Sequence, residues 1–328
     1  MIDIAETIKG VDMFELAQKT NAQVALNDEE RELTSELDAR FKEIGETGHD
    51  PEQEIAQFLR RTVNEEIYNA PDEILDLIFE RGSVGEFDEY QAAFMPPENT
   101  LVPYEAGFGG TVPKSYLDLK ALVPTWRNFQ IDSQLSFVDL RRNGWKSVSL
   151  IAENAVAALK NNMYAVVFDK IDSSITSGSA NYITESTSAP TAASMDQLAT
   201  YVAERANGND TLILALYKYI LSASKLEAAS DAMKEEMYRN GVLSYYGGIP
   251  MKALSSAKKI GGTKLMIPDK TIFGIAGKIG TLDMKGDIHT YQTEEPQREL
   301  INLYFKDFTF GYAFDNDTLK KVAKIVTA

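Results

Sequence analysis

The chain has 328 residues, of which 44% are hydrophobic and 10% aromatic, enough for a large core and for one to three domains. No apolar run approaches the roughly 18 to 20 residues that cross a bilayer, and the N-terminus lacks the basic and apolar regions of a secretory signal. Because the sequence has no cysteine, disulfides, thiolate metal ligands and cysteine nucleophiles are excluded, and we expect synthesis in the cytoplasm.

The formal net charge of −16 is concentrated at one end of the chain. Residues 1–100 hold 25 acidic and 8 basic side chains, a net of −17, whereas the rest of the chain is nearly neutral. A protein that reads nucleic acid directly usually presents a basic face. The N-terminal third is therefore a poor candidate for contact with DNA.

The acidic third is predicted to form short amphipathic helices. Asn27 and Glu30 have the spacing of a capping box, and Gly45 is expected to end that helix. A second helix is predicted to begin at Asp50 and Pro51, and a third to span residues 71–81. Such short helices are marginal alone, so they must pack against their own chain or against a neighbour.

Residues 95–145 differ in character, because five prolines up to position 124 exclude long helices. Apolar and polar residues partly alternate between positions 116 and 140, which is typical of extended strands with one exposed face. A stretch of extended chain with few apolar runs cannot form a core by itself. We therefore predict a projecting hairpin that lies on another subunit.

The strongest helical pattern follows in residues 147–172, where apolar residues recur every three or four positions and Ser147 offers an N-cap. A polar connector is expected over 173–194, and helices over 195–205, 211–222 and 228–239. Two long strands, 287–294 and 300–314, are predicted to close the chain. In the second strand the apolar phase changes near Lys306 and Asp307, which indicates a bulge or burial on both faces.

Two strings carry a resemblance to a known family. Residues 242–253 read VLSYYGGIPMKA, and residues 268–275 read PDKTIFGI. Together with the order of predicted elements, they resemble tailed-bacteriophage major capsid proteins over roughly residues 96–328. The resemblance implies an α+β chain with the Johnson, or Hong Kong 97-like, phage capsid fold: an N-terminal helical arm, an extended E-loop hairpin, a long spine helix, a P-domain and an A-domain.

The family's domains map onto this chain by position. The resemblance implies an acidic helical N-terminal arm over 1–95 and an extended segment with the E-loop hairpin over 96–145, the hairpin itself resembling 103–144. The spine helix and connector of the P-domain correspond to 146–194. The A-domain corresponds to 195–277, and the P-domain strands and C-terminus to 278–328.

The function implied is that of a major capsid protein in the virion, which is made and assembled in the host cytoplasm. Its main partner would be itself, in the hexamers and pentamers of an icosahedral head that encloses double-stranded DNA without sequence-specific contact. Scaffolding, portal and decoration proteins are further implied partners, and no membrane is involved. Two alternatives remain: an encapsulin-like shell that loads protein cargo, and a soluble α+β enzyme.

No catalytic, cofactor or metal site is predicted. The glycines at 107–110 and 274–280 do not have the P-loop spacing, since positions 272 and 279 are both isoleucine. Asp287 and His289 would share a strand face and could hold a metal, but a solvated strand face explains them as well. The chain is therefore not expected to be an enzyme, and no cofactor is implied.

Candidate intersubunit contacts are Trp126, Arg127, Arg141, Arg142 and Trp145, near the base of the predicted hairpin. Tryptophan and arginine are the residues most enriched at interface hot spots. We hypothesise that this basic group accepts the acidic N-terminal arm of an adjacent subunit.

Overall fold

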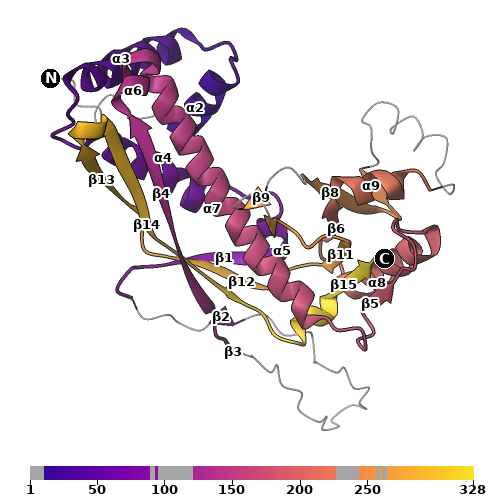
Figure 1. Cartoon of the computed structure of the whole chain (residues 1–328). Coiled ribbons are helices and arrows are strands. Elements are labelled where there is room, and N and C mark those ends of the chain that lie inside the picture. The colour runs from indigo at the N-terminus through magenta and orange to yellow at the C-terminus, as the bar shows by residue number, and fades with distance from the viewer. Residues whose placement is uncertain (1–10, 89–92, 95–120, 227–243, 256–258, 261–263) are drawn as a thin grey trace, which may run out of the picture.

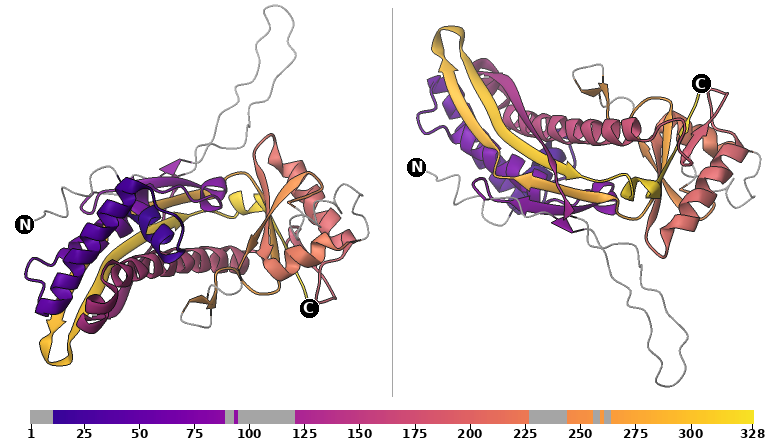
Figure 2. Two further views of the ribbon diagram at one scale, coloured as in Figure 1. Left: turned by 90° about the horizontal axis from the view of Figure 1, so that it is seen from above. Right: turned by 90° about the horizontal axis from the view of Figure 1, so that it is seen from below.

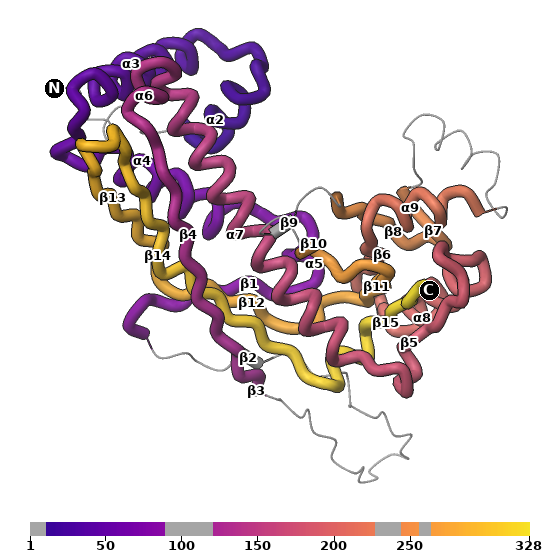
Figure 3. Tube along the Cα trace, viewed as in Figure 1, coloured from indigo at the N-terminus to yellow at the C-terminus, as the bar shows by residue number. Residues whose placement is uncertain are grey.

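The computed structural model describes residues 11–88, 93–94, 121–226, 244–255, 259–260 and 264–328. The chain forms two lobes, each built on its own β-sheet, and a long helix runs from the first lobe to the second (Figure 1). The tube view shows the C-terminus within the second lobe, far from the N-terminal helices (Figure 3).

The first lobe contains a five-stranded sheet in which β14 (Leu300–Ala313) is central. One edge of β14 pairs along its length with β4 (Thr125–Ser136). Its other edge pairs first with β13 (His289–Glu295) and then with β12 (Gly280–Lys285). Strand β1 (Phe79–Val84) extends the sheet in parallel to β12. Segments from three distant parts of the sequence therefore share one sheet.

The change of apolar phase in β14 is a bulge, as the sequence pattern predicts. The register between β14 and β4 shifts between Phe305 and Phe308, and Asp307 has a φ of 66°. An extra residue reverses the facing of the side chains that follow it. Both apolar sets, Phe305 before the bulge and Phe308 and Phe310 after it, are consequently buried in the same core.

Helix α7 (Trp145–Ser174) is the predicted spine helix and is 30 residues, or roughly 45 Å, long. It runs alongside β14 and β4 (Figure 2). It begins two residues before the predicted Ser147 cap. Asp38 supplies the cap instead, because its Oδ1 accepts a hydrogen bond of 3.2 Å from the Trp145 amide. Gly144 permits this approach, since a Cβ there would lie 2.2 Å from the Asp38 carboxylate.

The described helices of the acidic N-terminal third pack against their own chain, which is one of the two alternatives that the sequence leaves open. The structure describes α2 (Met13–Asn21), α3 (Asp28–Thr47), α4 (Glu54–Asn64), the π-helix η1 (Glu65–Asn69) and α5 (Leu75–Ile78). Their apolar faces meet α6 (Phe137–Asn143) and α7 in a shared core. The predicted capping box of Asn27 and Glu30 is present, but the helix that it starts continues past Gly45 to Thr47.

Two predictions for the first lobe are wrong in part. Residues 71–81 form only the short α5 before the chain becomes β1, since pairing with β12 outweighs the local helical pattern. Residues 125–136, expected to lie in the projecting hairpin, are β4 of the sheet. The chain then forms α6 (Phe137–Asn143), capped by the Ser136 hydroxyl and anchored by the buried Phe137.

The second lobe has a six-stranded sheet flanked by α8 (Ala192–Ala206) and α9 (Tyr217–Ser224). Its strands, in spatial order, are β5 (Tyr182–Thr184), β15 (Val322–Val326), β11 (Thr271–Ala276), β6 (Thr211–Leu216), β8 (Ile249–Leu254) and β7 (Tyr245–Tyr246). The predicted helix over 211–222 is therefore a strand followed by a short helix. The run Thr211–Leu216 is buried between two neighbouring strands, which an unbroken apolar sequence suits.

Two strands of this sheet come from segments that the sequence analysis assigns outside the A-domain. Strand β5 comes from the predicted polar connector, and β15 from the region assigned to the P-domain, yet both belong to the second sheet. The remaining described elements are the short pairs β2 (Ala93–Phe94) with β3 (Ala121–Leu122) and β9 (Lys259–Ile260) with β10 (Lys264–Leu265), and the 3-10 turns η2 (Pro296–Arg298) and η3 (Thr318–Lys321). The helix predicted over 228–239 lies outside the described residues.

Candidate assembly surfaces

The five predicted contact residues do not form one cluster. Trp126 and Arg127 lie near the start of β4, whereas Arg141 and Arg142 lie on α6, beyond the other end of that strand. A strand of 12 residues is roughly 40 Å long, so the two groups are well separated. We call Trp126 and Arg127 the β4 pair, and Arg141 and Arg142 the α6 pair.

Trp145 must be removed from the contact set, because its side chain is only 1% exposed. The ring stacks on Phe41 with centroids 6.3 Å apart and meets Phe58 edge-on at 5.3 Å. Its Nε1 donates a hydrogen bond of 3.1 Å to the Thr20 hydroxyl. Trp145 therefore joins α2, α3 and α4 to the start of α7 and has no surface to offer another chain.

The α6 pair is exposed, but half of it already has a partner in its own chain. Arg141 Nη2 lies 2.9 Å from Glu299 Oε1, in the turn between β13 and β14. Within the part of the chain that the structure describes, no ion pair involves Arg142. Because the acidic helices pack on their own subunit, nothing in the structure requires this pair to receive a neighbour's acidic arm.

The β4 pair lies on the open edge of the sheet. The Trp126 ring lies over Gly311, where a Cβ would come within 2.8 Å of it, and Lys285 Nζ is 5.8 Å from its centroid. The ring is half-buried and Arg127 is exposed, and, as consecutive residues of a strand, the two side chains point to opposite faces of this sheet edge. Such a pair is suited to an interface anchor.

Two exposed apolar side chains were missed by the sequence analysis. Phe87 is 93% exposed and Val123 is 79% exposed, and they flank residues 89–120 in the sequence. Phe87 follows β1 and Val123 follows the two-residue β3, so no periodicity marks either side chain as exposed. Single exposed apolar side chains are common on protein surfaces, so these two do not mark an interface by themselves.

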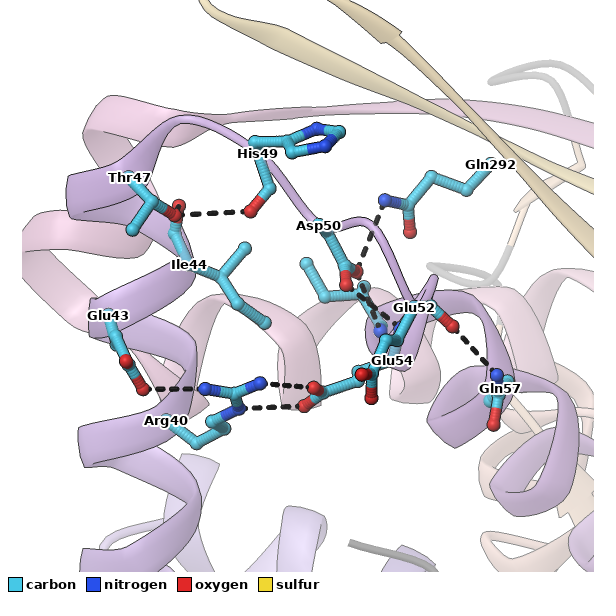
Figure 4. A network of polar contacts seen from close by, with 11 residues as sticks. Arg40, Glu43, Ile44, Thr47, His49, Asp50, Glu52, Glu54, Gln57 and Gln292 are labelled. Atoms are coloured by element: carbon cyan, nitrogen blue, oxygen red, sulfur yellow. Dashed lines mark hydrogen bonds and ion pairs between the residues drawn. The ribbon is translucent and has the colours of Figure 1, made fainter. Parts of the chain in front are cut away.

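A polar network fastens the acidic helices to β13 (Figure 4). Asp50 is buried, and its carboxylate accepts hydrogen bonds from the Glu54 and Ile55 amides and from Gln292 Nε2. Glu294 in turn accepts from the Asp50 amide at 2.6 Å, and its other oxygen lies 2.6 Å from His49 Nδ1. These contacts fix the turn between α3 and α4 against the sheet.

Glu185 is a second buried carboxylate with a structural role. It accepts hydrogen bonds from the Thr191 hydroxyl at 2.7 Å and from the Thr191 and Ser186 amides. Donation by the Thr191 hydroxyl, the largest effect, lowers the pKa of Glu185 to about 2. The carboxylate therefore ties the β5 end to the N-terminus of α8.

We expect Glu185→Gln to destabilise the unassembled chain by about 1–3 kcal/mol at neutral pH. The glutamine NH2 group would face hydrogen-bond donors where the carboxylate oxygens now accept. Since the folded-state pKa lies below the ordinary value of 4.5, this stabilisation is present above that value and is lost as the pH falls toward 2. Denaturant titrations at several pH values test this. The variant Glu204→Gln, at an exposed position, is the control. If the free energy of unfolding lost in Glu185→Gln stayed constant down to acid pH, the structural role of the Glu185 carboxylate would be refuted.

Asp287 and His289, which the sequence offers as possible metal ligands, have separate ionic neighbours. His289 lies 3.9 Å from Glu86, and Asp287 instead lies 3.9 Å from Arg60. Among the described residues, no three His, Asp or Glu side chains converge on one point. Within those same ranges, no helix has the length and apolar character needed to span a membrane.

Comparisons with known proteins identify the fold. No protein-family model and no curated protein matches the chain. Among solved structures, a capsid chain of an empty GTA particle matches with a TM-score of 0.52 at 12% identity, over 93% of this chain and 100% of that one. A chain of Mycobacterium phage Bobi matches at 0.50 and 13% identity (82% and 98% covered), and one of Microbacterium phage Oxtober96 at 0.50 and 11% (79% and 92% covered). The chain therefore has the α+β phage capsid fold that its sequence resembles.

Proposed function

We propose that this chain is a tailed-bacteriophage major capsid protein that assembles into the hexamers and pentamers of an icosahedral head. The observation that carries the proposal is the fold match, which extends over nearly all of this chain and all of a capsid chain. The half-buried Trp126 and the exposed Arg127 on the edge strand β4 support it, because tryptophan and arginine are enriched at interface hot spots.

The arrangement of the lobes suits repeated association of one chain. Different surfaces at the two ends of an elongated subunit favour head-to-tail contacts, which close into rings. We propose that such rings enclose double-stranded DNA in the virion, with scaffolding, portal and decoration proteins as further partners. Synthesis and assembly in the host cytoplasm belong to the same proposal.

We propose that the first lobe is the P-domain and that the second lobe is the A-domain. The P-domain then comprises α7 and the five-stranded sheet, and the A-domain gains β5 and β15 relative to the boundaries expected from the sequence. The E-loop is assigned to residues 103–124, most of which lie outside the described residues. Of the acidic helical arm expected over residues 1–95, the structure describes the helices α2 to α5, whereas β1 within the same range joins the sheet of the first lobe.

We expect the double variant Trp126→Ala, Arg127→Glu to fold normally but to give at least about tenfold fewer shells. A hot-spot contact is worth about 2 kcal/mol or more, and each copy in a shell repeats it. Particle yield on a sucrose gradient measures the effect. Arg31→Glu, an exposed charge reversal on α3, is the control, and equal yields from all three chains would exclude the β4 pair from the interface.

Negative-stain electron microscopy of the purified chain tests the proposed function. Closed particles with fivefold and sixfold capsomers are expected, whereas discrete small oligomers would favour the enzyme alternative. The ultraviolet absorbance of particles from infected cells separates the two kinds of shell. Particles that hold protein cargo in place of nucleic acid would indicate an encapsulin-like compartment.

A further inference from the structure

A pocket of about 630 Å³ lies where helix α7 ends in the second lobe. Its walls come from the end of α7 and the turn that follows, from α8, and from the η3 region. The lining includes Ser174, Asn181, Tyr201, Arg205, Lys320 and Lys321. None of the described residues that line it is Asp or Glu, although the chain as a whole has a net charge of −16. The pocket is thus a local cationic site on an acidic protein.

The cation on α8 is held in place before any ligand arrives. The Arg205 guanidinium stacks on the Tyr201 ring, 3.6 Å from its centroid, and Nη1 is 3.4 Å from the Tyr201 carbonyl oxygen. The Tyr201 hydroxyl donates a hydrogen bond of 2.9 Å to the Lys320 carbonyl. A stacked arginine loses less conformational freedom when it binds a ligand, which favours binding.

Backbone carbonyls in and beside η3 accept hydrogen bonds from other parts of the same chain. The side-chain Nδ2 of Asn181 donates to the Leu319 carbonyl at 3.1 Å and to the Val322 carbonyl at 2.6 Å. The Lys320 carbonyl is occupied by Tyr201. The Leu319, Lys320 and Val322 carbonyl oxygens are therefore already hydrogen-bonded within the chain.

The carboxylates near the pocket are weak competitors for its cations. Asp317 lies 2.9 Å from Lys320, and Glu204 lies 3.7 Å from Arg205. Both carboxylates are more than half exposed, and an exposed ion pair contributes at most about 1 kcal/mol. A ligand that engages two cations at once can therefore displace them.

We propose that this pocket, which we call the α7-end pocket, binds a phosphate group of a nucleic-acid backbone. The fork of Arg205 matches two phosphate oxygens, and the two lysines approach from a second side as point charges. The ligand class rests on the proposed function, in which the chain encloses DNA. An acidic segment of another copy is the competing ligand, since residues 1–100 carry −17. Cations on two walls fit a tetrahedral phosphate better than a planar carboxylate.

Fluorescence anisotropy with a short labelled DNA duplex and the purified, unassembled full-length chain tests the proposal. We expect Arg205→Gln, Lys321→Gln to weaken binding about tenfold and to reduce the slope of log K against log salt by about two. The control Lys225→Gln, Lys278→Gln removes the same charge from exposed positions outside the pocket, and a change below about twofold is expected. Arg205→Lys keeps the charge but loses the fork, so an intermediate loss is expected.

Competition separates the sources of the anion. Inorganic phosphate at millimolar concentration should displace the duplex from the wild-type chain but not change the residual binding of the pocket variant. Stronger displacement by a glutamate-rich peptide than by phosphate would overturn the proposal in favour of a carboxylate-bearing partner. Equal losses in the pocket and control variants, or no duplex binding by the wild type, would also overturn it.

Electron microscopy of the same four chains separates this inference from the proposed function. Shells that form normally while duplex binding does not depend on the pocket would contradict only the α7-end pocket. Pocket-dependent duplex binding by a chain that never forms shells would contradict only the assignment as a capsid protein.

Discussion

Trp145→Ala is expected to destabilise the unassembled chain by about 3–5 kcal/mol, the usual cost of truncating a fully buried tryptophan. The indole fills the point where three N-terminal helices meet the start of the spine helix, and its Nε1 hydrogen bond to Thr20 would be lost as well. Urea denaturation followed by circular dichroism at neutral pH measures this difference.

Trp126→Ala is the matched control, because Trp126 is the other of the two tryptophans in the sequence. Its ring is half-buried on the sheet surface, so a loss of no more than about 1–2 kcal/mol is expected. If Trp126→Ala proved as destabilising as Trp145→Ala, the assignment of one ring to the core and the other to an assembly surface would be wrong.

Lys324→Met is expected to destabilise the chain by about 2–4 kcal/mol and to loosen the junction of the two lobes. Lys324 is buried in β15, and its Nζ donates to the Asp172 carbonyl at 2.7 Å and to Asp172 Oδ1 at 2.8 Å, at the end of α7. The methionine would leave that carboxylate without its partner, and breaking a buried pair costs more than the pair contributes. Denaturant titration and hydrogen exchange at the end of α7 measure the two effects.

An exposed ion pair between α7 and β10 provides the control. Lys264 and Asp169 are in contact, but their side chains are 49% and 44% exposed, so Lys264→Met should cost less than about 1 kcal/mol. The double variant Lys324→Met, Asp172→Leu should recover part of the loss, because no uncompensated carboxylate remains. Equal costs for Lys324→Met and Lys264→Met would show that β15 does not hold the end of the spine helix.

Features that depend on neighbouring residues were predictable from the sequence. The capping box of Asn27 and Glu30 needs only a spacing of three, and the bulge at Asp307 is visible as a change of phase within one strand. The spine helix was also predicted, since its apolar repeat continues over many turns. These signals are local, so a single sequence contains them in full.

Features that depend on distant partners were not predictable. The spine helix starts at Trp145 because Asp38, 107 positions earlier, caps it. Residues 211–216 satisfy a helical pattern as well as a strand, and pairing with β11 and β8 decides between them. The candidate contact residues were only partly predictable for the same reason, since burial depends on distant partners. Residue type alone selects Trp145, Trp126 and Arg127 alike, and only the fold separates the buried Trp145 from the accessible Trp126 and Arg127.

Sedimentation velocity of the purified full-length chain, over a range of concentrations, tests most directly whether this fold exists to bind copies of itself. A particle of megadalton mass, built from 36.4 kDa subunits and lost in the β4 pair variant, is the predicted result. A single species at the subunit mass that persists at the highest concentration would contradict the proposed function.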